Sequence, residues 1–138
     1  MAIAIPVERT LTQIDYVRLT RLLAHGPGAG AVESMQELLA SSDLVASPEV
    51  PPTVVTMYTQ VLLQDPDRDA APYTLTLCYP DHAEPARGFV SVLSPVGTSL
   101  LGLRVGEVAR WPLPGGRFGA ARIVAVLFQP EATGDYET

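Results

Sequence analysis

Few residues of this sequence combine types and spacing that could support metal binding. Asp65, Asp67 and Asp69 alternate as in the first half of a calcium-binding loop, but the central glycine and the distal bidentate glutamate of such a loop are missing. The two histidines, His25 and His82, lie far apart in loop-like sequence without a cluster of other ligands. We therefore interpret the aspartates as an acidic turn, and we expect no metal site and no cofactor.

The serines and the glycine-rich segment also lack the surroundings that catalysis requires. Ser42, Ser91 and Ser94 do not occur in the G-x-S-x-G pattern of a nucleophile elbow. The glycines of residues 26–30 precede a predicted helix, but they follow a helix instead of a strand, and no GK[ST] motif comes after them. The chain contains no lysine, which excludes Schiff-base and Walker-lysine chemistry. These patterns predict a protein that is not an enzyme.

The composition indicates a globular protein with a protein partner. All nine basic residues are arginine and the formal net charge is −6, so the clustered positive charge of a duplex-binding surface is missing and any DNA contact should be indirect. The hydrophobic content of 47% is sufficient for a packed core. No apolar run approaches the roughly 18 residues of a membrane span, and the first residues do not resemble a signal peptide. We expect a cytoplasmic protein without membrane association, with the single cysteine, Cys78, buried in the core.

Two short helices are predicted within residues 1–50, over residues 11–24 and 31–42. The apolar positions that recur at helical spacing are Tyr16, Leu19 and Leu23 in the first segment and Val32, Met35, Leu38 and Leu39 in the second. Thr12 and Asp15 resemble a capping box at the start of the first helix. One proline and three glycines between the helices require a turn. The sequence therefore predicts a short helical hairpin, or coiled coil.

A proline-rich segment, residues 47–52, is predicted to be a stiff, extended hinge between this hairpin and a second unit, residues 51–138. After the hinge, apolar residues alternate with period 2, which is typical of strands. The predicted strands cover residues 55–63, 73–79, 89–93, 107–113 and 122–128. Between the third and fourth strands, Ser94 can cap a short helix, Pro95 suits its first position and Gly102 can end it. The expected fold class is α+β, an antiparallel sheet with one short helix.

Five short motifs follow one another in this second unit: V-S-V-L at 90–93, S-P-V-G at 94–97, L-L-G at 100–102, V-G-E at 105–107 and P-G-G at 114–116. In this order and spacing they resemble the C-terminal domain of the GreA/GreB family of transcription factors. Residues 54–57 and 129–136 further resemble the Rnk branch of that family, named for regulation of nucleoside diphosphate kinase. The resemblance covers most of residues 50–138.

The resemblance implies an FKBP-like domain and binding to RNA polymerase at the rim of its secondary channel. In Gre proteins a long N-terminal coiled coil enters that channel, and acidic residues at its tip help hold a metal ion for transcript cleavage. Here residues 25–31 contain no Asp or Glu, and a helix of about 13 residues spans only roughly 20 Å. The implied function is therefore a transcription modulator that binds polymerase without stimulating cleavage.

Ser94, Pro95, Val96 and Gly97 match the loop through which Gre proteins are thought to contact polymerase, so we expect the partner-binding site there. Capping, helix initiation and close packing could also explain these residues. One departure from the family concerns Leu93, because some Gre proteins have an aspartate at that position. A charged contact would be missing there.

Two alternative functions remain beside this one. The implied fold is shared with peptidyl-prolyl isomerases, whose sites need an aromatic-lined pocket, and a fold alone does not establish an activity. The resemblance to the Rnk branch also suggests a direct effector of nucleoside diphosphate kinase.

Overall fold

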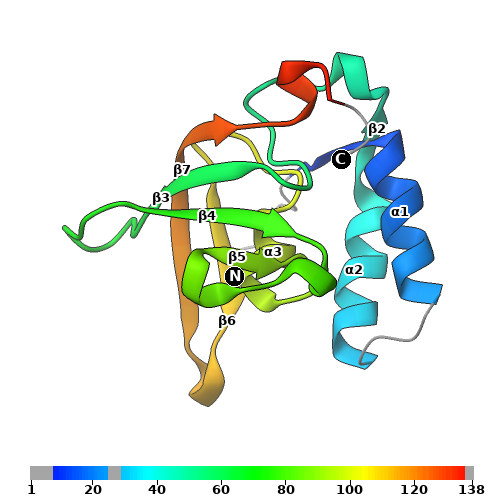
Figure 1. The fold of residues 1–138 in the computed structure, drawn as a ribbon. Coiled ribbons are helices and arrows are strands. Elements are labelled where there is room, and N and C mark those ends of the chain that lie inside the picture. The colour runs from blue at the N-terminus through cyan, green and yellow to red at the C-terminus, as the bar shows by residue number, and fades with distance from the viewer. Residues whose placement is uncertain (1–7, 25–28, 136–138) are drawn as a thin grey trace.

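Two helices and a small parallel sheet form the N-terminal part of the fold. The computed structural model describes residues 8–24 and 29–135. Strand β1 (Thr10–Thr12) leads directly into helix α1 (Gln13–Ala24), and helix α2 (Ala29–Ser41) is followed by strand β2 (Asp43–Val45), which runs parallel to β1. The two helices lie side by side, next to the larger sheet (Figure 1).

Helix α1 begins two residues later than the periodicity predicts, because residues 11 and 12 belong to β1. The predicted cap is confirmed, since the Thr12 hydroxyl oxygen accepts a hydrogen bond from the Asp15 backbone N–H at 3.0 Å. Leu19 of α1 and Met35 of α2 are fully buried, as their spacing predicts. The turn was predicted over residues 25–30, but α2 begins at Ala29, two residues earlier than expected, and residues 25–28 lie outside those the structure describes.

The prediction of an extended hinge over residues 47–52 is wrong for its first half. Ser47–Glu49 forms a 3-10 helix, in which Pro48 occupies one of the first positions, where its missing N–H costs no hydrogen bond. Val50 is only 7% exposed, so the segment packs against the fold instead of spanning solvent.

The main sheet has five strands, as predicted, in the order β5-β4-β3-β7-β6. Their bounds are Gln60–Gln64 (β3), Tyr73–Cys78 (β4), Phe89–Ser91 (β5), Val108–Pro112 (β6) and Phe118–Phe128 (β7). The prediction of a wholly antiparallel sheet is wrong at one edge, because β5 pairs parallel to β4. Two 3-10 turns, Pro80–His82 and Pro85–Arg87, lie in the connection, so the chain crosses back instead of closing a tight hairpin.

The first predicted strand is shorter than expected. Residues 55–59 alternate in polarity, yet β3 begins only at Gln60. Thr56 and Thr59 close a turn here, since the Thr56 backbone N–H donates to the Thr59 hydroxyl oxygen at 2.9 Å. Tyr58 within this turn has a φ of +64°, which a strand does not permit.

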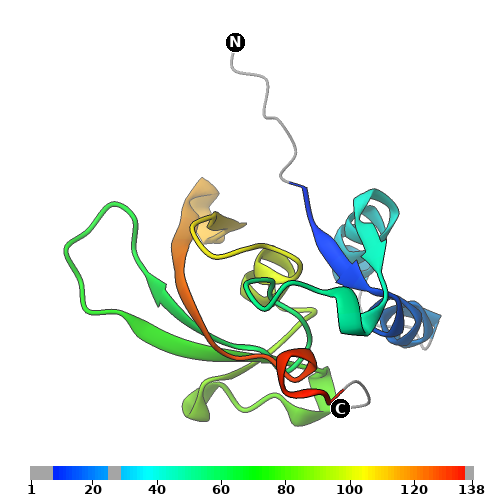
Figure 2. The same cartoon turned by 90° about the horizontal axis from the view of Figure 1, so that it is seen from above.

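Helix α3 (Pro95–Leu100) forms where it is predicted, with Ser94 as its N-cap and Gly102 at a φ of +81° after its end. Figure 2 shows the sheet curving around this helix. Leu100 and Leu101 are 1% and 0% exposed, and they belong to one hydrophobic cluster that also contains residues of α1, α2 and the sheet. Cys78 is buried, as predicted. None of the helices within the described ranges is long and apolar enough to cross a membrane.

Candidate partner-binding site at the start of helix α3

The four residues predicted to bind a partner form the N-cap and the first turn of α3. The Ser94 hydroxyl holds this turn in shape, because it donates to the Ser91 carbonyl oxygen at 2.7 Å and accepts from the Gly97 backbone N–H at 3.1 Å. Pro95 is exposed, whereas Ser94 and Val96 are half-buried. Pro95 and part of Val96 are therefore the side chains of this turn that a partner can reach.

Gly97 has a different role from its neighbours. It is buried, and a Cβ atom at this position would lie 2.0 Å from the carbonyl oxygen of Ser91. Only glycine allows the helix backbone to approach β5 so closely. Gly97 therefore shapes the site without offering a side chain to a partner.

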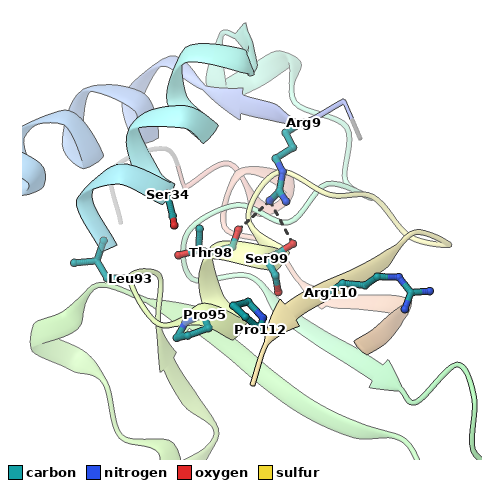
Figure 3. Close-up of a pocket in the computed structure, with 8 residues that line it drawn as sticks. All are labelled: Arg9, Ser34, Leu93, Pro95, Thr98, Ser99, Arg110 and Pro112. Atoms are coloured by element: carbon teal, nitrogen blue, oxygen red, sulfur yellow. Dashed lines mark hydrogen bonds between the residues drawn. The ribbon is translucent and has the colours of Figure 1, made fainter. Parts of the chain in front are cut away.

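A cleft of about 420 Å³ opens beside this turn, between α2, α3 and β6 (Figure 3). Its lining residues are Arg9, Ser34, Leu93, Pro95, Thr98, Ser99, Arg110 and Pro112. The cleft combines apolar walls with hydroxyl groups and two guanidinium groups. Because Ser34 belongs to α2, this helix contributes to the same surface as the predicted docking turn.

Arg9 fixes the end of α3 that is distant from Pro95. Its Nη1 atom donates to the backbone carbonyl oxygens of Thr98, Ser99 and Leu101, at 2.9, 3.3 and 2.9 Å. A cation near the last carbonyls of a helix satisfies acceptors that have no partner within the helix. Burial lowers the pKa of Arg9, and the nearby Glu107 carboxylate raises it. The side chain stays charged, because an arginine is not deprotonated in proteins.

The second guanidinium is more accessible. Arg110 is an exposed residue of β6, and Figure 3 shows its side chain extending outward. Sequence reasoning identified neither arginine as part of the site. Arg9 precedes the first predicted helix and reaches a carbonyl 89 residues further along the chain, so no local pattern could indicate the contact.

A second groove lies between α1 and the end of β4. Its lining includes Leu22, Tyr58, Tyr79 and His82, with Arg18 and Arg21 beside them. His82 is exposed, and its Nδ1 atom lies 2.6 Å from the Tyr58 hydroxyl, so this histidine has a hydrogen-bond partner that the sequence did not indicate. Tyr58 and Tyr79 meet edge to face, with ring centroids 5.8 Å apart.

The aspartates considered for metal binding form a simple turn. The Asp67 backbone N–H donates to Asp65 Oδ1 at 2.8 Å, which confirms the acidic turn. Within residues 8–24 and 29–135, no group of three or more His, Cys, Asp or Glu side chains could hold a metal ion.

The main sheet and helix α3 lie almost entirely within a part of the chain that matches a known family. Residues 50–127 match the family described as "Transcription elongation factor, GreA/GreB, C-term". The chain belongs to this GreA/GreB family. It is 34% identical over 128 residues to the "Regulator of nucleoside diphosphate kinase" of Escherichia coli strain K12, which covers 91% of this chain and 93% of that protein. The resemblance to the GreA/GreB family and its Rnk branch is thereby confirmed.

Two further similarities agree with this assignment. The "Transcription elongation factor GreA" of Chloroherpeton thalassium is 32% identical over 85 residues, 62% of this chain and 53% of that protein. A solved structure described as "Prokaryotic transcription elongation factor GreA/GreB from Nitrosomonas europaea" superposes with a TM-score of 0.73 and 33% identity, covering 89% of this chain and all of that one.

Proposed function

We propose that this protein is a transcription regulator that binds RNA polymerase at the entrance of its secondary channel and acts there by occupancy. The observation that carries the proposal is the GreA/GreB match over residues 50–127, which coincides with the sheet and α3. In this proposal residues 51–138 form an FKBP-like docking domain and residues 1–50 form a short helical hairpin. A regulator of transcription would act in the cytoplasm, where bacterial polymerase is found.

The docking surface in this proposal centres on the turn Ser94–Gly97. Pro95 is exposed while hydrogen bonds to Ser94 hold the turn in place, which favours binding with little loss of conformational entropy. Replacing Pro95 by glutamate places an unpaired charge in the interface, and its desolvation is costly.

The experiment compares the polymerase affinity of Pro95→Glu with that of Pro72→Glu, a matched change at another exposed proline. Pro95→Glu should weaken binding by roughly tenfold or more, because an uncompensated interfacial charge costs several kcal/mol. If Pro95→Glu and Pro72→Glu had equal affinities and equal melting temperatures, the interface would have to lie elsewhere than at this turn.

The proposed regulator does not stimulate transcript cleavage. Metal-assisted cleavage needs carboxylate ligands at the tip of the helical pair, and residues 25–31 contain none. Helix α1 has 12 residues and spans only roughly 18 Å. In backtracked polymerase complexes with Mg²⁺, the protein should leave the cleavage rate at the level of polymerase alone. A clear acceleration would refute this part of the proposal.

Two alternatives each have one observation in their favour. The groove with Tyr58, Tyr79 and His82 has the aromatic lining that a peptidyl-prolyl isomerase requires, and a prolyl-peptide isomerisation assay tests that activity directly. The name of the Escherichia coli relative favours a direct effect on nucleoside diphosphate kinase. If the protein captures polymerase subunits but not nucleoside diphosphate kinase from a bacterial lysate, the result would support polymerase binding over a direct effect on the kinase.

A further inference from the structure

The charge of the cleft beside α3 is opposite to that of the chain as a whole. The protein carries a formal net charge of −6. The cleft is nevertheless lined by two arginines, Arg9 and Arg110, and no Asp or Glu is among its described lining residues, although the Glu107 carboxylate acts on Arg9 from outside the lining. A positive cleft attracts a negatively charged group from a partner, whereas the net negative charge of the rest of the protein repels such a group.

We propose that this cleft binds an acidic side chain, Asp or Glu, of the protein segment on which Pro95 docks. The inference rests on the proposed function and deepens it, because it names the chemistry of the partner. The docking segment then presents an apolar side chain to Leu93 and Pro95 and a carboxylate to the arginines.

The two arginines contribute in different ways. Three hydrogen bonds to the end of α3 hold the Arg9 guanidinium, so binding to it immobilises no further side chain. Arg110 is exposed and can turn toward a ligand at the mouth of the cleft. A guanidinium provides the paired donors that match a carboxylate.

Leu93, Pro95 and Pro112 complete the recognition surface. They form apolar walls beside the arginines, and a partner that covers these walls would exclude water and strengthen a charged contact. The residue before the Ser-Pro pair is Leu93, so the turn itself adds no negative charge. This side of the protein is therefore complementary to an acidic and partly apolar segment. Phosphate groups of a nucleic acid have no apolar part that would contact the apolar walls of the cleft.

Arg110 provides the clean test, because Arg9 also holds α3 in place and its replacement would disturb the helix. The full-length Arg110→Glu variant is compared with Arg68→Glu, which makes the same change in net charge at an exposed position of the β3–β4 loop. Affinity for purified RNA polymerase is measured at several salt concentrations, together with the melting temperature.

Arg110→Glu should weaken binding roughly tenfold to a hundredfold, as like charges at an interface do, and Arg68→Glu should not. The affinity of Arg110→Glu should also depend less on salt than that of the wild type. Equal affinities of Arg110→Glu and Arg68→Glu, while Pro95→Glu still weakens binding, would overturn this inference and leave the proposed function intact. A wild-type protein that does not bind polymerase would overturn both.

A labelled single-stranded oligonucleotide serves as a second probe. The inference expects no measurable binding by wild-type protein. Binding of the oligonucleotide by the wild type that Arg110→Glu abolishes would assign the cleft to phosphate groups and overturn the assignment to an acidic protein segment.

Discussion

The buried carboxyl group of Asp15 links α1 to the sheet-containing part of the fold, and its replacement by asparagine tests how this link responds to pH. Asp15 is 4% exposed, and its Oδ2 atom accepts a hydrogen bond from the Met57 backbone N–H at 3.2 Å. The pKa of Asp15 is raised to about 6, mainly by burial; the hydrogen bond from Met57 opposes this rise, and the carboxylate of Glu131 contributes to it.

The sign of the pH dependence follows from this shift. Because folding raises the pKa of Asp15 from 3.8 to about 6, the folded state binds this proton more tightly than the unfolded state does. The contribution of Asp15 to the free energy of unfolding is therefore largest below pH 3.8, declines as the pH rises to about 6, and is constant above that. A rise of roughly two pKa units corresponds to a decline on the order of 3 kcal/mol.

Asparagine keeps the carbonyl oxygen that accepts from Met57 but does not titrate. The free energy of unfolding of Asp15→Asn, measured by urea denaturation from pH 4 to pH 7.5, should therefore lack this decline. The stability of the variant relative to the wild type should increase across the range by about 3 kcal/mol. Asp69→Asn, which removes the same charge from an exposed loop, is the matched control. Parallel pH profiles of Asp15→Asn and the wild type would refute the reasoning.

Three further predictions concern stability. Leu101→Ala should lower the free energy of unfolding by about 2–5 kcal/mol in urea denaturation, because the side chain is fully buried, while Leu127→Ala at a 50% exposed position should change it little. Equal losses would place Leu101 outside the core. Gly97→Ala should lower the melting temperature by several degrees, because the added Cβ meets the Ser91 carbonyl oxygen at 2.0 Å; an unchanged melting temperature would contradict the close approach. Thr12→Ala should cost about 1 kcal/mol by removing the cap of α1, and a stability equal to wild type would show that the cap contributes nothing.

Helix α3 shows how much of the docking site is specified by interactions between residues close in sequence. Ser94 caps the helix, Pro95 starts it and Gly102 follows its end in a left-handed conformation. Each role depends on one residue and its immediate neighbours, so the sequence predicted the helix and its bounds closely. The family motifs cover the same residues, and for this reason the docking turn could be proposed from the sequence.

The region before β3 shows where a local pattern misleads. Val55 and Met57 are buried, as their alternation suggested, but Val54 and Thr56 before and between them are equally buried, so no solvent-facing side alternates with a core-facing one here. The backbone turns instead of extending, because Thr56 and Thr59 hydrogen-bond to each other and Tyr58 adopts a positive φ. A side-chain hydrogen bond can satisfy the backbone without a neighbouring strand, and the alternation of residue types does not reveal such a bond.

The sequence by itself determined the family, the strand number of the main sheet, the position of α3 and the capping residues of α1 and α3, because these depend on motifs and on residues a few positions apart. Only the tertiary structure decided that β5 runs parallel to β4 and that Arg9, Ser34 and Arg110 share one cleft with Pro95. Arg9 reaches its carbonyl partners across about 90 positions of the sequence. Such contacts arise when helices and strands that are far apart in the sequence pack together. The spacing of neighbouring residues therefore does not predict them.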